Sequence, residues 1–194
     1  MSVVLVLDTE TSALPSRGGD YSDVRLIELG YVVLDARTGK SLKEVSLLVD
    51  NPGVGDTLEN THVHGITVDE LRDHGVPLET ALNCLALDMK DAHAVVAHNM
   101  KFDYEVLLTE ARRVPEGLLL SQLLPSKAQA QPSFVCTMLW GRKMAYGHNK
   151  YPKLVELYSS LFPDNTEGAP GRAHRALDDA RVCAACFAKM CEWW

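Results

Sequence analysis

Two acidic residues, Asp8 and Glu10, follow the apolar segment 3–7 near the start of the chain. Side chains along a strand alternate between its faces, so acids separated by one residue point to the same side. Carboxylates held together at the end of a buried strand repel each other and lose hydration. A cation bound between them would make the arrangement favourable, although an acid at a strand end is also a common turn residue.

A third acid, Asp103, lies in the segment 99–114, where the spacing of the apolar residues predicts a helix. Asp103 precedes Leu107 by one helical turn and therefore lies at the border of the apolar face. An exposed acid in the first turn, favoured by the helix dipole, is the alternative interpretation.

The segment 174–194 predicts another helix, and its apolar stripe has Asp179 at its border and Asp178 on the solvent side. His174 lies five residues before Asp179, so the two side chains would diverge within one helix. We therefore expect His174 on the loop that leads into the helix. A histidine beside acids can accept a proton near neutral pH, although a lone histidine is more commonly an ordinary surface residue.

Asp8, Glu10, Asp103 and Asp179 are four acids at the edges of apolar elements. Carboxylate oxygens suit Mg²⁺ or Mn²⁺. Two such ions can activate a water molecule and stabilise the leaving oxygen of a phosphodiester. The sequence therefore predicts that these acids bind two divalent ions and that His174 takes the proton from the attacking water.

Strands and helices in alternation are expected to position these residues. We expect strands at 3–8, 25–34, 43–49, 92–99 and 131–138, and helices at 67–75, 77–91, 99–114, 151–162 and 174–194. The first strand is apolar on both faces and should lie in the middle of the sheet. The pattern predicts an α/β fold in which helices flank one mixed sheet.

The length of 194 residues, with 46% hydrophobic and 23% charged residues, fits a single domain over 1–194. The chain shows neither a secretory signal nor a segment that could cross a membrane, so we expect the cytoplasm, or the nucleus of a eukaryote. The odd count of five cysteines argues against a disulfide framework. Cys183 and Cys186 are expected to be reduced and packed on a helix face.

Charge is distributed unevenly around a net value of −7. Residues 1–110 hold 19 acidic and 8 basic residues, whereas residues 111–194 hold 7 and 11. The basic residues gather in 112–153, among Trp140, Tyr146 and Tyr151, which could stack on bases. This division fits a metal site in one half and a polyanion bound to the other. Ordinary solvated charges explain it equally well.

The sequence resembles the DEDDh (DnaQ-like) 3′→5′ exonucleases in three segments, "LDTETSAL", "VVAHNMKFDYEVL" and "HRALDDA". The resemblance extends over roughly 3–110 and 133–190. One departure follows the first two acids, where the family more often has Thr-Gly-Leu and this chain has Ser12, Ala13 and Leu14.

The resemblance implies a ribonuclease-H-like fold, with a central five-stranded mixed sheet of order 3-2-1-4-5 whose second strand is antiparallel to the others. It implies release of 5′-mononucleotides from the 3′ end of DNA or RNA, as in DNA repair or proofreading. It assigns Asp8, Glu10 and Asp179 to the ion that holds the attacking water, with Asp8 also bridging to the second ion. It also implies that Asp103 binds the second ion directly or through water, and that His174 is the general base.

The resemblance also implies contacts with the terminal nucleotide from residues near the first two motifs: Thr9, Thr11, Leu14, His98 and Asn99. His98 could equally be a structural partner of its loop. Two other functions stay open. One is a non-catalytic nucleic-acid-binding or polymerase-associated module, and the other is an endonuclease of the same fold. The choice between DNA and RNA, a homodimer and association with a polymerase are also left open.

Overall fold

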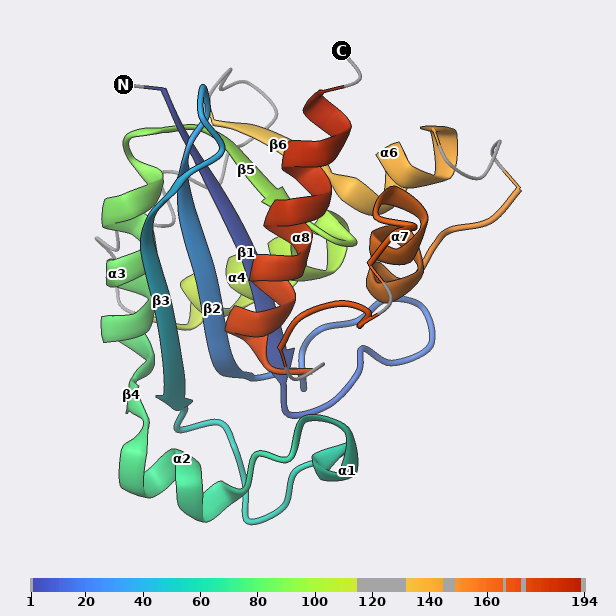
Figure 1. Ribbon diagram of the computed structural model, residues 1–194. Coiled ribbons are helices and arrows are strands. Elements are labelled where there is room, and N and C mark those ends of the chain that lie inside the picture. Colours follow the sequence, from blue (N-terminus) through green and yellow to red (C-terminus); the bar gives the residue numbers. More distant parts are fainter. Residues whose placement is uncertain (1, 115–131, 145–148, 166, 172–173, 193–194) are drawn as a thin grey trace.

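The structure, a computed structural model, describes residues 2–114, 132–144, 149–165, 167–171 and 174–192. At the centre of the described part lies a mixed sheet with strand order β4-β3-β2-β1-β5-β6 (Figure 1). The strands are β1 (Val3–Thr11), β2 (Leu26–Asp35), β3 (Ser41–Asp50), β4 (Val76–Pro77), β5 (Ala92–Ala97) and β6 (Ser133–Cys136). β2 pairs antiparallel with β1 and β3, and the other neighbours are parallel, so β2 runs opposite to the rest.

This α/β architecture confirms the predicted sheet and the central place of β1, with one addition. The expected order 3-2-1-4-5 corresponds to β3-β2-β1-β5-β6. The additional strand, β4, has two residues and pairs with the end of β3 at the sheet edge, where Val76 lies opposite Val49. Two residues are too few to produce a period that a sequence can reveal.

The helices are α1 (Thr61–His64), α2 (Val68–His74), α3 (Leu78–Met89), α4 (Met100–Arg113), α6 (Thr137–Met144), α7 (Leu154–Leu161) and α8 (Ala176–Cys191). The prediction of a strand through 138 is wrong at its end, because the chain turns into α6 at Thr137. α1 lies in a segment expected to be a loop. No helix in the described ranges is long and apolar enough to cross a bilayer.

Helices cover both faces of the sheet, with α8 on one face and α3 and α4 on the other (Figure 1). Val4 and Val6 of β1 pack on the α8 side, whereas Leu5 and Leu7 pack on the α3 and α4 side. This alternation follows from the two-residue period of a strand. Asp8 continues the series of Val4 and Val6, so its side chain lies on the face that α8 covers.

Gly30 of β2 lets the first turn of α8 approach the sheet closely. A Cβ atom at Gly30 would lie 2.1 Å from the backbone nitrogen of Leu177 and 2.2 Å from the carbonyl carbon of Ala176. Asp8 lies opposite Gly30 in the β1–β2 pair, and Glu10 lies opposite Glu28. The start of α8 is therefore placed directly beside the acids of β1.

The five cysteines are free, and Cys183 and Cys186 are buried in α8, as expected. The apolar stripe of α8 packs against β1, β2 and β5. Asn99 occupies the N-cap position of α4 with a left-handed φ of 72°, but its side chain makes no capping hydrogen bond. α4 therefore begins where the sequence predicts, without a capping side chain.

Candidate active site

Asp103 of α4 is brought to the end of β1 by a hydrogen bond from that strand. The Thr9 hydroxyl donates to Asp103 Oδ1 over 2.8 Å, and both side chains are buried. Thr9 lies between Asp8 and Glu10, on the opposite face of β1. One strand end therefore places two acids on one side and holds a third acid from the other side.

Asp8 is the centre of this group of acids. Burial raises its pKa well above the ordinary value, and the negative charges of Asp103, Asp179 and Glu10 raise it further. The charge of Glu28 acts in the same direction. The four acids singled out in the sequence therefore lie close enough together to oppose one another's ionisation.

Glu10 and Asp103 also have raised pKa values. Burial, followed by the charges of Asp179 and Glu28, raises the pKa of Glu10 to about 8. Burial raises the pKa of Asp103 to about 7, although the hydrogen bond from Thr9 acts in the opposite direction. The described residues therefore supply too little positive charge to balance these carboxyl groups when they are ionised.

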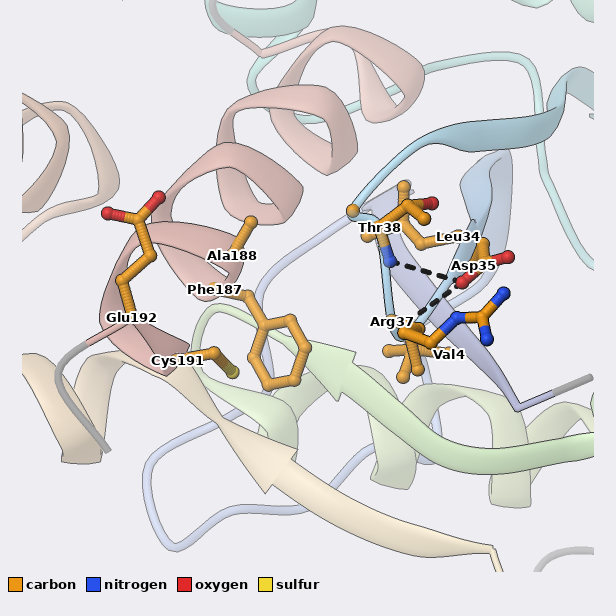
Figure 2. A pocket seen from close by; sticks show the side chains of 11 residues that line it. Val4, Leu34, Asp35, Arg37, Thr38, Phe187, Ala188, Cys191 and Glu192 are labelled. Carbon is orange, nitrogen blue, oxygen red and sulfur yellow. Dashed lines mark hydrogen bonds between the residues drawn. The ribbon is translucent and has the colours of Figure 1, made fainter.

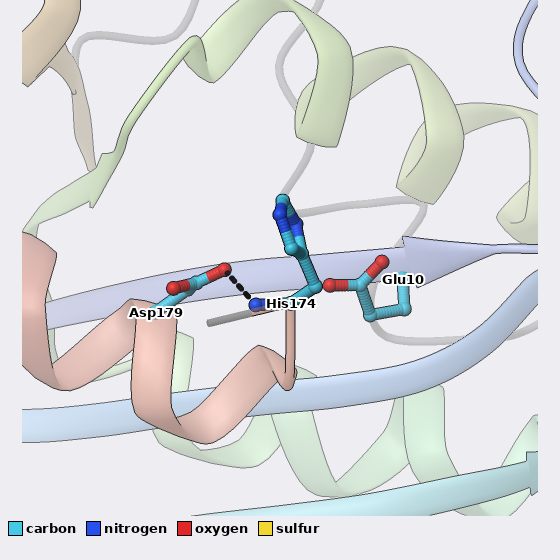
Figure 3. A group of neighbouring side chains, drawn as sticks. All are labelled: Glu10, His174 and Asp179. Carbon is cyan, nitrogen blue, oxygen red and sulfur yellow. Dashed lines mark hydrogen bonds between the residues drawn. The ribbon is translucent and has the colours of Figure 1, made fainter. Parts of the chain in front are cut away.

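Glu10, His174 and Asp179 form the exposed side of the cluster (Figure 3). Each offers one ligand atom, and these atoms lie within 4.8 Å of one another. His174 lies on the loop before α8, as expected, and its backbone N–H donates to Asp179 Oδ2 over 3.0 Å. The pKa of Asp179 is raised chiefly by burial, and its contact with His174 offsets part of this.

The donor set fits divalent metal ions. It consists of carboxylates and one imidazole, and hard ions such as Mg²⁺ and Mn²⁺ prefer carboxylate oxygens. Among the described residues, Arg175 lowers the pKa of Glu10, but its guanidinium is bound to Glu28. Cations from outside the chain would remove the mutual repulsion of Asp8, Glu10 and Asp103.

Glu28 and Arg175 are part of this region and were missed in the sequence. Glu28 is 1% exposed and forms an ion pair with Arg175, with 2.6 Å between Oε1 and Nη2. The signal was present: Glu28 is the one acid between Leu26 and Leu34, in a strand that is otherwise apolar. The other acids lie at the edges of apolar elements, whereas Glu28 lies inside a strand.

The residues expected to contact a nucleotide differ in their exposure and in whether their side chains already make hydrogen bonds. The Thr11 hydroxyl donates to the carbonyl of Ala13 over 2.9 Å, and the Thr9 hydroxyl is bound to Asp103. Leu14 is 66% exposed, and Asn99 is also exposed. Both residues are therefore available to a ligand near the acids.

His98 makes two hydrogen bonds within the fold. One ring nitrogen lies 3.0 Å from the Thr137 hydroxyl and the other 2.9 Å from the carbonyl of Pro152. Burial lowers the pKa of His98. These bonds favour the structural alternative, in which His98 joins the end of β5 to α6.

Ala13, which replaces the more usual glycine, does not strain the backbone. Within the described ranges, the residues other than glycine with positive φ are Asn60, Asn99 and His174. The turn after Glu10 therefore does not require the conformation that glycine adopts most readily.

The basic segment 112–153 is only partly described, and Lys127 and Tyr146 lie outside the described residues. Trp140 stacks on Phe187 with 5.9 Å between the ring centroids, so it belongs to the packing around α8. Tyr151 is 52% exposed, and the guanidinium of Arg142 lies 4.2 Å from its ring centroid. Of these two aromatic residues, Tyr151 is the one available to stack on a base.

A cavity of about 420 Å³ lies at the other end of the sheet, next to Val4 and Phe187 (Figure 2). Its acid Asp35 accepts the backbone N–H groups of Arg37 and Thr38 at 2.8 and 3.1 Å. These bonds close the turn between β2 and β3. The cavity is lined by none of the four clustered acids, so it is separate from the candidate site.

This sheet order, with acids converging at the end of the first strand, places the protein in the ribonuclease-H-like class of α/β proteins. The chain belongs to the exonuclease family, because the RNase T family model, described as exonuclease, matches residues 5–187. The resemblance seen in the three motifs is thereby confirmed. No curated protein sequence matches the chain.

Solved nuclease structures share this fold. The 3′-exonuclease described in "3′-end specific recognition of histone mRNA stem-loop" is 19% identical with a TM-score of 0.68, over 97% of this chain and 63% of that chain. This chain thus spans less than two thirds of that protein. Exonuclease X in complex with 5′ overhanging duplex DNA is 24% identical with a TM-score of 0.61, over 100% of this chain and 92% of that chain. The nuclease domain of 3′hExo, a DEDDh family member bound to rAMP, is 17% identical with a TM-score of 0.63, over 98% of this chain and 92% of that chain.

Proposed function

We propose that this protein is a metal-dependent 3′→5′ exonuclease that hydrolyses phosphodiester bonds at the 3′ end of a nucleic acid strand and releases 5′-mononucleotides. The observation that carries the proposal is the convergence of Asp8, Glu10, Asp103 and Asp179, whose pKa values are raised by burial and, for Asp8 and Glu10, by the other acids. Acids arranged in this way are unfavourable by themselves and favourable around cations.

Asp8, Glu10 and Asp179 would hold one divalent ion, and Asp8 and Asp103 would hold a second. Ions bound there lower the pKa of water and neutralise the charge that develops on the phosphate and the leaving oxygen. Thr9 keeps the Asp103 carboxylate aligned through its hydrogen bond of 2.8 Å. The ligand atom of Glu10 lies within 4.8 Å of those of His174 and Asp179, on the exposed side of the site.

His174 would act as the general base. Its side chain is exposed, and a ring nitrogen lies near the carboxylates of Glu10 and Asp179. A water molecule held between these groups could pass its proton to the imidazole as it attacks the phosphorus atom. The exposed Leu14 would lie against the terminal nucleotide, next to the acids of β1.

We infer that the substrate is a 3′-terminal strand of DNA or RNA. The structural neighbours include a 3′-exonuclease that recognises an mRNA stem-loop and exonuclease X in complex with an overhanging DNA duplex. The scissile phosphate is common to both polymers, and the proposed acids act on that phosphate. The sugar therefore has to be identified by experiment.

Oligonucleotides labelled at the 5′ end test the proposal. We expect a ladder of products shortened from the 3′ end in Mg²⁺ or Mn²⁺, and none in EDTA. The panel contains single-stranded DNA, duplex DNA, a mismatched end and RNA, each with a free or a blocked 3′ hydroxyl. Binding without shortening in any metal would support a non-catalytic module instead, and cleavage of circular single-stranded DNA would support an endonuclease.

A further inference from the structure

Glu28 and Arg175 form an ion pair next to the acid cluster that the proposed reaction does not use. The Glu28 carboxylate accepts hydrogen bonds from Arg175 Nε at 3.0 and 3.1 Å and from Arg175 Nη2 at 2.6 Å. It also accepts the backbone N–H of Ala176 over 2.9 Å. A forked contact between guanidinium and carboxylate restricts the orientation of both groups. β2 therefore holds the loop before α8 in one geometry.

The first turn of α8 depends on this carboxylate. Arg175 occupies the N-cap position but supplies no side-chain capping bond. A helix start leaves backbone N–H groups without partners, and an N-cap side chain usually satisfies one of them. Glu28 satisfies one from a different element. Gly30, on the same face of β2, provides the space that the helix start occupies.

His174 immediately precedes this anchored turn and has a backbone conformation that needs support. Its φ is 64°, which is unfavourable for a residue with a Cβ atom. Its side chain is exposed, so packing contributes little to its placement. The His174 N–H is held by its hydrogen bond to Asp179. The next residue, Arg175, is held by its ion pair with Glu28.

We propose that Glu28 is a positioning residue for the cleavage reaction: through Arg175 and Ala176 it holds His174 against Glu10 and Asp179. The inference rests on the proposed function, in which His174 takes a proton from water. Glu28 itself makes no contact with the reacting atoms. Glu28 lies opposite Glu10 in the β1–β2 pair, so the loop before α8 and the acids of β1 lie at the same end of the sheet.

The variant Glu28→Gln tests this role because it keeps the size of the side chain and removes its charge. We expect kcat to fall about 10- to 100-fold while KM changes little, because a small misplacement of a catalytic group lowers the rate without removing substrate contacts. Glu110→Gln is the matched control, since Glu110 is also a buried glutamate paired with an arginine. We expect its kcat to stay within about twofold of wild type at a temperature where both variants are folded.

A double-mutant cycle separates positioning from general stability. In the His174→Ala background, Glu28→Gln should lower kcat by less than about twofold, because the group it positions is absent. A purely structural role would give the same loss in both backgrounds, and that result would overturn the inference. An unchanged kcat in the single variant, or an equal loss in Glu110→Gln, would also overturn it.

NMR signals of the His174 ring supply a readout independent of cleavage. We expect one set of dispersed signals in the wild type and signals closer to those of an unstructured histidine in Glu28→Gln. If the wild type cleaves nothing but this change occurs, the proposed function fails and the positioning role stands. If the wild type cleaves and neither kcat nor the His174 signals change in the variant, the positioning role fails. If Glu28→Gln does not fold, Arg175→Gln takes its place in each measurement, because it keeps the hydrogen bond from the Ala176 N–H to Glu28.

Discussion

Buried acids occur in two regions of this molecule, and their partners differ. Glu110 of α4 accepts hydrogen bonds from the backbone of Leu26 and the amide of Asn51, and it forms an ion pair with Arg113. Asp8 and its neighbours at the end of β1 have chiefly one another. Both regions belong to one fold, so burial alone does not distinguish a functional acid from a structural one.

The difference lies in where the compensating charge comes from. Arg113 also donates to the carbonyls of Val24 and Ser22, so the Glu110 region ties the loop before β2 to α4 with groups of the chain itself. The acids of β1 are brought together by the fold, and the described residues supply too little positive charge to balance them. An acid whose partner is supplied by the chain stabilises the fold, and an acid whose partner is absent points to a ligand.

Asp8→Asn should have the largest effect on the acid cluster. Asp8 lies at its centre and would contact both ions, so its loss removes several kcal/mol of transition-state stabilisation, or a rate factor of about 10⁴ or more. Gel assays with the labelled oligonucleotides measure this loss. Thermal unfolding in EDTA at pH 8 should show a higher melting temperature than wild type, because the substitution relieves repulsion. Wild-type turnover in this variant would refute the assignment of Asp8.

His174→Ala should lower kcat by a factor between about 10² and 10⁴, the range expected for loss of a general base. Because His174 is exposed, its removal should leave the melting temperature nearly unchanged. Metal affinity, measured by Mn²⁺ titration of the protein without substrate, shows whether the imidazole is a base or a ligand. A large loss of affinity with only a small loss of kcat at saturating Mn²⁺ would assign His174 to metal binding.

Glu110→Gln should show the opposite pattern, with a loss of stability and little change in cleavage. Breaking a buried ion pair is strongly destabilising, but Arg113 is 26% exposed and recovers some hydration, so we expect a loss of about 2 kcal/mol. Denaturant unfolding in EDTA and in Mg²⁺ measures it. The loss should be the same in both solutions, because Glu110 is not one of the proposed metal ligands. A loss that appears only with Mg²⁺ would contradict the division between the two regions.

The pH dependence of stability should also report on the acids at the end of β1. Burial raises the pKa of Glu10 from 4.5 to about 8 and that of Asp103 from 3.8 to about 7. Between these values the folded protein binds more protons than the unfolded chain, so the metal-free protein should lose stability as the pH rises from about 4 to about 8. Millimolar Mg²⁺ should flatten this slope. Melting curves in EDTA that stay level over this range would show that folding does not raise the pKa values of these acids.

The sequence predicted the sheet and the place of the four acids because their signals are local. Apolar runs mark the strands, and the spacing of one helical turn between Asp103 and Leu107 can be read from a single helix. Glu28 and Arg175 are 147 residues apart, and nothing local indicates that they meet. The missing cap of Asn99 and the bonds of His98 likewise depend on partners that tertiary contacts bring.

Asp178 and Asp179 are adjacent residues in the first turn of α8 and provide the most direct comparison. Asp178 was expected on the solvent side, but its side chain is only 24% exposed and forms an ion pair with Arg181 at 2.8 Å. Arg181 also binds Glu44 of β3 at 2.6 Å. The helical phase was right in turning Asp178 away from the cluster, and wrong in leaving it to solvent, because Arg181 of the same helix, itself bound to Glu44 of β3, supplies a partner.

Asp178→Asn should therefore have the smallest effect. Removing one partner from a partly exposed pair costs about 0–1 kcal/mol, and kcat should stay within about twofold of wild type. Asp179→Asn, one residue away, should abolish most cleavage because it removes the charge of a proposed metal ligand and weakens the acceptor of the His174 N–H. The ratio of the two rates, measured under the same conditions, tests the assignment within one helical turn. Equal losses would mean that both carboxylates serve the site, and the distinction drawn between these two residues would fail.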